Sequence, residues 1–153
     1  MKIKILLLFG LLVLVASCNT SSVYKKDYEF DKNQWQKSDA KTFDFTIDDD
    51  AKLYDITFSL SHVFDYQFAS IPLSFKWIKP DGTSDVISID LKMKDENGKE
   101  LGECAIDVCD LKHIIDSKVK LQKGKHQIIV SHTFDYDYLP NIIHIGLEVI
   151  KLK

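Results

Sequence analysis

Apolar and polar residues alternate with a period of two through most of this chain, and this pattern restricts the fold more than any other feature. The segments with the alternation are residues 43–47, 56–62, 73–77, 87–94 and 143–149. Successive side chains of a β-strand point to opposite faces, so each segment is predicted to be a strand with one buried and one solvated face. Turn-forming residues separate these segments, at positions 48–50, 79–82, 95–98 and 123–124.

Short strands with one apolar face, and no long helical pattern, predict two packed antiparallel sheets. We therefore expect an all-β fold, an antiparallel β-sandwich of about eight strands that is jelly-roll or immunoglobulin-like. Residues 104–121 fit the alternation least, and residues 107–115 are also compatible with a helical turn.

The N-terminus predicts export and a lipid anchor. Two lysines precede an apolar run of about eleven residues, Ile5 to Val15, which fits a secretory signal and is shorter than the roughly 20 residues of a membrane span. The run ends in Val15-Ala16-Ser17-Cys18, which resembles a lipobox, where small residues admit the signal peptidase and the cysteine receives its acyl groups, such as palmitate. The alternative is an ordinary secretory signal followed by a chance cysteine.

This interpretation divides the chain into three parts. We expect residues 1–17 to be a signal peptide, residues 18–31 a lipidated tether, and residues 32–153 the β-sandwich domain. The tether is predicted because residues 19–31 are polar and have no sustained period. Asn19 follows the cysteine in place of the aspartate that is linked to inner-membrane retention, which favours the outer membrane. No acidic cluster directly follows Cys18, which favours a domain that faces the periplasm.

The charge of the chain excludes one class of partner. The net charge is −3, and loss of residues 1–17 with their two lysines makes it −5. All 20 basic residues are lysines. A mildly acidic surface without arginine argues against nucleic acid and against electrostatic binding to anionic lipids.

Two cysteines, Cys104 and Cys109, lie five positions apart. In an oxidising compartment they are a possible disulfide. Within one strand an odd offset would point them to opposite faces, so a bond requires a turn between them; otherwise they are two small half-buried thiols. Together with His113 they resemble a zinc site, but this irregular spacing is weak evidence. We predict no metal and no cofactor.

One octapeptide occurs twice. SHVFDYQF (residues 61–68) returns seventy positions later as SHTFDYDY (residues 131–138), and a proline follows each copy. Strand parity places both histidines at the end of a core-facing row. In the structural interpretation the histidine caps the core and Asp-Tyr turns the chain, with the tyrosine ring packed and its hydroxyl in water.

In the functional interpretation the two copies lie side by side and form a pocket. Aromatic rings pack on the apolar faces of sugars and carboxylates accept hydrogen bonds from hydroxyls, so a glycan or peptide is one possible ligand. Two histidines and two aspartates are also possible metal ligands. The predicted patch consists of His62, Asp65, Tyr66, Phe68, His132, Asp135, Tyr136 and Tyr138.

We predict that the protein is not an enzyme. The sequence has no nucleophile elbow and no HExxH zinc motif. Its acidic residues are many, but spacing alone selects no pair as an acid and its catalytic partner.

Taken in order, several short motifs resemble the gliding-motility lipoprotein family (GldH) of Bacteroidetes. They are the lipobox cysteine, Trp35 before Phe43 and Phe45, the stretch with Leu60, His62, Asp65, Tyr66 and Phe68, Pro80-Asp81-Gly82, Gly98 with Leu101 and Gly102, Lys123-Gly124, and the closing series Leu139, Pro140, Ile142, Ile145, Gly146, Leu147 and Val149. The chain departs from the family at Ser61 and Asp135, near places where the family has arginines. It also departs at Glu100, where the family has an aromatic residue.

The resemblance implies an outer-membrane-associated accessory of the gliding machinery that acts through contacts with other envelope proteins. The alternative from another class is a glycan-binding lipoprotein built on the same sandwich.

Overall fold

The structure is a computed structural model that describes residues 21–153, so the predicted signal peptide and the predicted lipid site at Cys18 lie outside the described residues. Eleven strands and one 3-10 turn (Asp31–Asn33) form within residues 21–153. The strands are β1 (Ser21–Glu29), β2 (Gln34–Gln36), β3 (Lys41–Ile47), β4 (Leu53–Val63), β5 (Ser70–Ile78), β6 (Ser84–Lys92), β7 (Glu103–Ala105), β8 (Val108–Lys120), β9 (Gly124–His132), β10 (Tyr138–Pro140) and β11 (Ile142–Lys151). Over this described range, no helix has the length and apolar character needed to cross a bilayer.

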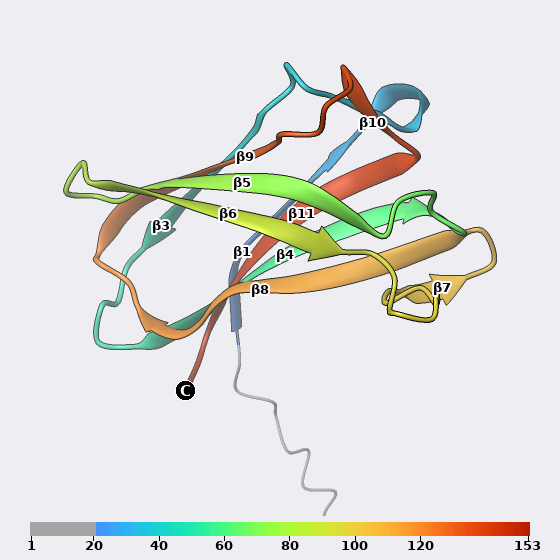
Figure 1. Cartoon of the computed structure of the whole chain (residues 1–153). Coiled ribbons are helices and arrows are strands. Elements are labelled where there is room, and N and C mark those ends of the chain that lie inside the picture. Colours follow the sequence, from blue (N-terminus) through green and yellow to red (C-terminus); the bar gives the residue numbers. More distant parts are fainter. Residues whose placement is uncertain (1–20) are drawn as a thin grey trace, which may run out of the picture.

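The long strands form two antiparallel sheets (Figure 1). One has the order β1-β11-β4-β8-β7, the other has the order β3-β9-β5-β6, and the short strands β10 and β2 pair separately. Apart from the β5–β6 hairpin, successive long strands alternate between the sheets, which is the arrangement of a jelly roll built from two Greek keys. The predicted all-β sandwich is confirmed, and the strand order selects the jelly roll over the immunoglobulin-like alternative.

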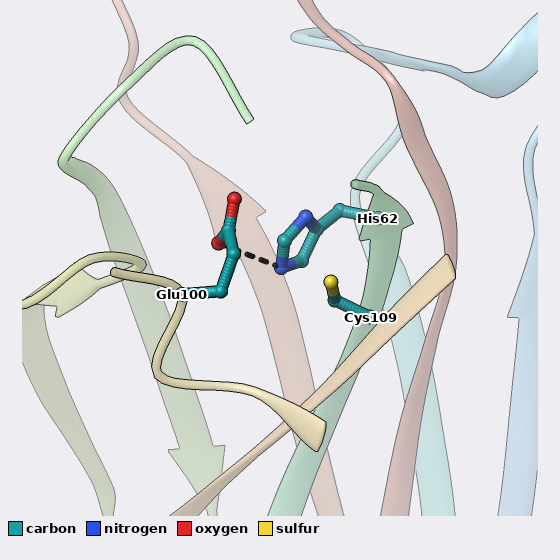
Figure 2. Close-up of side chains that lie close together, drawn as sticks. All are labelled: His62, Glu100 and Cys109. Carbon is teal, nitrogen blue, oxygen red and sulfur yellow. Dashed lines mark ion pairs between the residues drawn. The ribbon is translucent and has the colours of Figure 1, made fainter. Parts of the chain in front are cut away.

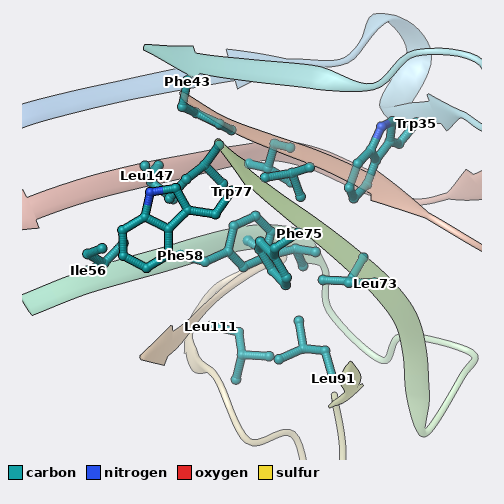
Figure 3. Packing of buried hydrophobic residues seen from close by; sticks show 14 of the residues in the cluster. Trp35, Phe43, Ile56, Phe58, Leu73, Phe75, Trp77, Leu91, Leu111 and Leu147 are labelled. Carbon is teal, nitrogen blue, oxygen red and sulfur yellow. The ribbon is translucent and has the colours of Figure 1, made fainter. Parts of the chain in front are cut away.

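Buried apolar side chains of the long strands pack between the two sheets (Figure 3). Phe58 of β4 and Phe75 of β5 meet across the two layers, with ring centroids 5.2 Å apart and ring planes at 80°. Both side chains are at most 1% exposed, and burial of such a side chain contributes roughly 1.5–3 kcal/mol. The alternation in the sequence therefore reports the core directly.

Strand β1 occupies residues that we expected in the tether, so that prediction was wrong for residues 21–29. This strand pairs only with β11, at the edge of the larger sheet. Only Tyr24 and Tyr28 pack against the core. An edge strand with two inward side chains leaves too weak an alternation to be recognised from sequence.

The helical turn considered for residues 107–115 was also wrong, because β8 runs through them from Val108 to Lys120. Its register against β4 shifts twice, between Tyr54 and Ile56 and between Ile56 and Thr57, and β8 carries the extra residue each time. A bulge reverses which face the following side chains point to. The alternation is therefore interrupted in the middle of a continuous strand.

Different strand ends and loops lie at the two ends of the sandwich. Ser21 pairs with Lys151, and Lys151 pairs with Tyr54, so β1 starts at the end where β11 finishes and β4 begins. We call this the proximal end. At the opposite, distal end, His62 pairs with Ile142 and with Cys109. Figure 1 shows the C-terminus beside the start of β1, and β7 and β10 away from it.

Candidate functional site

The two copies of the octapeptide meet at the distal end. Phe68 of the first copy and Phe134 of the second have ring centroids 4.8 Å apart. A chain of aromatic contacts extends from this pair in both directions, through Tyr66 to His62 on one side and to Tyr136 on the other, with neighbouring centroids 5.2–5.8 Å apart. The two corners are therefore packed into one structure.

The two copies nevertheless differ in exposure. Tyr66 is 1% exposed, whereas Tyr136, which occupies the same place in the second copy, is 68% exposed. Burial raises the pKa of Tyr66 well above its usual range. Of the eight residues predicted as a patch, His62, Tyr66 and His132 are buried and Phe68 is half-buried, while the exposed members are Asp65, Asp135, Tyr136 and Tyr138. The eight side chains therefore do not line a common groove.

His132 has a structural role. It is 3% exposed, and burial, the largest cause, lowers its pKa, so the ring is neutral near pH 7. Its Nε2–H donates to the Trp35 carbonyl at 3.0 Å, and the two rings lie edge to face, 5.1 Å apart. Trp35 in turn stacks on Phe30 at 5.3 Å. The second histidine thus attaches β9 to the short strand β2 inside the core.

His62 has different surroundings. It lies directly opposite Cys109 in the β4–β8 ladder, and Cys109 is bonded to Cys104 by a disulfide across the β7–β8 hairpin. Residues Ile106 and Asp107 form the turn that an odd spacing of the cysteines requires. Glu100 approaches from the loop between β6 and β7, and Figure 2 shows its side chain beside His62 of β4 and Cys109 of β8.

Polar atoms in this cluster are incompletely paired. The Nδ1 atom of His62 lies 2.9 Å from the Val63 carbonyl, which can only accept, so Nδ1 carries the proton. The Nε2 atom lies 3.9 Å from Oε2 of Glu100, and both atoms are buried without a hydrogen-bond partner among the described residues. The other carboxylate oxygen of Glu100 accepts the Tyr66 backbone N–H at 2.9 Å. Within residues 21–153, His62, Glu100 and Cys109 are the three possible metal ligands whose donor atoms gather within 4.8 Å.

The sequence did not reveal this cluster. We paired the cysteines with His113, which lies four positions beyond Cys109 on the same strand, whereas the imidazole comes from the neighbouring strand. Glu100 lies in a loop, where no periodicity shows which side chain it meets. The only signal was that a carboxylate stands where the resemblance implies an aromatic residue.

A second polar group lies on the outer face of the larger sheet. The Ser61 hydroxyl donates to the Asp110 carboxylate, and His144 Nε2 lies 2.8 Å from Ser61 Oγ. With the serine proton directed to Asp110, the Nε2–H tautomer of His144 donates to Oγ in this arrangement. Ser61 is also only 1% exposed. This group has the residue types of a hydrolytic triad but not its order of proton transfer.

Several exposed apolar side chains lie at the distal end, around the first corner with the β7–β8 hairpin and on the second corner, and we call them the distal apolar residues. They are Phe64, Leu101, Ile106, Val108, Tyr136 and Tyr138, which are 37–93% exposed. The Phe64 backbone N–H donates to the Asp107 carbonyl at 2.8 Å, which joins the first corner to the β7–β8 hairpin. These residues are the candidate contact surface at this end of the sandwich.

Comparisons with known proteins place the chain among lipoproteins. The model of the family "GldH lipoprotein" matches residues 22–149. The chain is 28% identical over 116 residues to the gliding motility lipoprotein GldH of Flavobacterium johnsoniae, over 76% of this chain and 72% of that protein.

Two solved structures share a distant likeness. Dimeric latent PorU from Porphyromonas gingivalis has a TM-score of 0.39 at 7% identity, over 83% of this chain and 12% of that chain. The VP2 subviral particle of infectious bursal disease virus has a TM-score of 0.36 at 16% identity, over 87% of this chain and 31% of that chain. The protein therefore spans less than a third of either chain.

Proposed function

Because the chain belongs to the GldH lipoprotein family, we propose that it is a lipid-anchored interaction subunit of the gliding machinery or a related envelope complex, acting by protein contact and not by catalysis. The family makes it a lipoprotein of the cell envelope. Its finer role follows from the separation of the proximal and distal ends.

A lipid on Cys18 would hold the proximal end at the membrane. Strand β1 starts at Ser21, and three extended residues span at most about 10 Å. The distal end is a strand length further away, and β1 has nine residues, which corresponds to about 30 Å. Apolar side chains at the distal end would therefore face away from the anchoring bilayer, where a protein partner is available to them.

Ile106 is the observation that carries this proposal. It lies at the tip of the β7–β8 hairpin, is 93% exposed, and has a φ of 57°. A β-branched residue in the left-handed region costs of order 1–3 kcal/mol and gains no burial in the isolated chain. Asparagine would suit the same turn better, so an isoleucine there is best explained by a contact made with a partner.

Outer-membrane attachment and a periplasmic orientation complete the proposal. Asn19 after the cysteine and the lack of an adjacent acidic cluster support them. The Cys104–Cys109 disulfide suits an oxidising compartment. A non-catalytic role is supported by the group around Ser61, in which the serine hydroxyl donates to Asp110 and not to the histidine.

The experiment compares two variants of the full chain, each produced with its signal in the source bacterium. One replaces the distal residues by Phe64→Ser and Ile106→Asn, and the matched control replaces exposed apolar residues elsewhere by Val86→Ser and Ile114→Ser. We expect the distal variant to lose envelope proteins that co-purify with the wild type from detergent-solubilised envelopes, while the control retains them. Recovery of the same proteins by both variants, or of none by the wild type, would contradict the proposal.

The anchor is tested separately. Cys18→Ser is expected to prevent incorporation of labelled palmitate and to release the protein from the membrane fraction. Labelling of this variant would refute the assignment of Cys18 as the acylated residue.

A glycan-binding function is the second candidate, and it is favoured by the second corner alone. There the exposed rings of Tyr136 and Tyr138 alternate with the exposed Asp135 and Asp137, which combines ring faces for sugars with acceptors for hydroxyl groups. A glycan array probed with the purified protein tests it. No response, or an equal response after Tyr136→Ser and Tyr138→Ser, would remove this candidate.

A further inference from the structure

Two buried polar atoms at the end of β4 face each other without a hydrogen bond. His62 is 0% exposed and the Glu100 side chain is 8% exposed, and the 3.9 Å between Nε2 and Oε2 is too long for a hydrogen bond. A buried polar group without a partner costs roughly 1–3 kcal/mol. Both atoms are therefore placed for a ligand that lies between them.

The remaining polar atoms of the two side chains are held as they are in metal sites. The other ring nitrogen of His62 donates to the Val63 carbonyl at 2.9 Å, which leaves the Nε2 lone pair free. The other oxygen of Glu100 accepts from the Tyr66 N–H at 2.9 Å and lies 3.9 Å from Lys94 Nζ. Metal-ligating histidines commonly donate their second N–H to a backbone carbonyl, and ligating carboxylates are themselves hydrogen-bonded.

Cys109 supplies a sulfur atom at the same place. It is 0% exposed and lies opposite His62 in the ladder, so that Figure 2 shows the three side chains converging. We propose that His62 Nε2, the Glu100 carboxylate and the Cys109 thiolate form a zinc site that becomes available when the Cys104–Cys109 disulfide is reduced. Nitrogen, oxygen and thiolate ligands together suit Zn²⁺.

The chemistry of this switch is a dithiol exchange followed by metal binding. A dithiol reductant transfers two electrons and two protons to the disulfide, becomes a disulfide itself, and leaves Cys104 and Cys109 as thiols. Zn²⁺ then displaces the proton of the Cys109 thiol, whereas His62 and Glu100 bind through lone pairs. Cys104, freed in the same step, is available as a fourth ligand. The oxidised protein offers only two of these ligands, so zinc occupancy would depend on the redox state.

The two cysteines provide a matched pair of variants. Cys104→Ser leaves Cys109 as a permanent thiol, so we expect the purified full chain to bind one equivalent of Zn²⁺ without any reductant. Cys109→Ser keeps only the exposed Cys104 of this pair and is expected to bind Zn²⁺ more than about tenfold more weakly. The same loss is expected for Glu100→Gln, which keeps the shape and the hydrogen-bond acceptor. Wild-type protein is expected to bind one equivalent after reduction only.

The measurement is competition for Zn²⁺ against a chromophoric chelator, with Co²⁺ as a spectroscopic probe. Co²⁺ bound to the Cys104→Ser variant is expected to show a thiolate-to-cobalt charge-transfer band that the Cys109→Ser variant lacks. Far-UV circular dichroism establishes that each variant is folded. Equal zinc affinity of the two cysteine variants, or no binding by folded reduced wild-type protein, would overturn the proposal and leave a buried water as the ligand. The co-purification experiment does not depend on this outcome.

Discussion

The repeated octapeptide allows the same substitution to be made at two places that the sequence cannot distinguish. Tyr66 is 1% exposed and packs against His62 and Phe68 at 5.2 and 5.8 Å between ring centroids. Tyr136, its counterpart, is 68% exposed. Removal of a buried aromatic side chain typically costs about 3–5 kcal/mol, and a surface substitution changes stability by about 0.5 kcal/mol at most. We therefore expect Tyr66→Ala to be destabilising by about 3 kcal/mol more than Tyr136→Ala.

Urea unfolding of both variants, followed by circular dichroism, measures this difference. A difference of 3 kcal/mol corresponds to a shift in Tm on the order of 10 °C for a domain of this size. Tyr66→Phe is the control, because it keeps the ring and removes a hydroxyl that has no partner among the described residues; it is expected to be neutral or stabilising. Equal losses for the two alanine variants would refute the assignment of the first corner to the core.

Two further predictions concern pH and backbone conformation. Burial lowers the pKa of His113, His126 and His132, so below about pH 6.5 the unfolded chain binds protons that the folded chain does not. The free energy of unfolding is therefore expected to decrease as pH falls, by up to about 1.4 kcal/mol per pH unit for each histidine. An unfolding free energy that is equal at pH 8 and pH 5 would contradict this. Gly124 has a φ of 124°, and an added Cβ would lie 2.9 Å from Cβ of Pro80, so Gly124→Ala is expected to lower stability by about 1–3 kcal/mol. Gly98→Ala is the control and is expected to lower stability less, because Gly98 has a φ of 79° but open space around an added Cβ. Equal changes in Tm would show that the contact with Pro80 is relieved without cost.

The sequence predicted the parts of the fold whose two faces differ clearly. Alternation identified most of the jelly roll because Phe43, Phe58 and Phe75 sit between polar neighbours on strands with a regular register. It failed at β1, where only Tyr24 and Tyr28 turn inward, and at β8, where bulges change the parity within one strand. Both failures occur where pairing with a neighbouring strand, and not the local pattern, determines the structure.

The candidate site shows the same limit more strongly. Parity correctly placed His62 and His132 facing the core, but two octapeptides that share the Phe-Asp-Tyr segment cannot predict that Tyr66 is buried and Tyr136 exposed. At the first corner, Glu100 of the loop between β6 and β7 also accepts a hydrogen bond from the Tyr66 backbone N–H. Cys109 became relevant only because the β4–β8 register sets it opposite His62. These are non-local pairings, and a single sequence contains no period that reports them.

The proposed function also accounts for the position of β1. With the lipid on Cys18 and the partner at the distal end, a pull between them would act along β1, whose start is the proximal end. The strand is held to β11 over a ladder that extends from Ser21 to Glu29, and its hydrogen bonds lie perpendicular to that direction. Such a load shears many bonds together, whereas an anchor at the opposite end of β1 would peel them one at a time. Under the proposed function, an exposed edge strand with few core contacts would serve as a firm attachment, and the segment that the sequence presents as a polar tether would join the membrane to the sandwich.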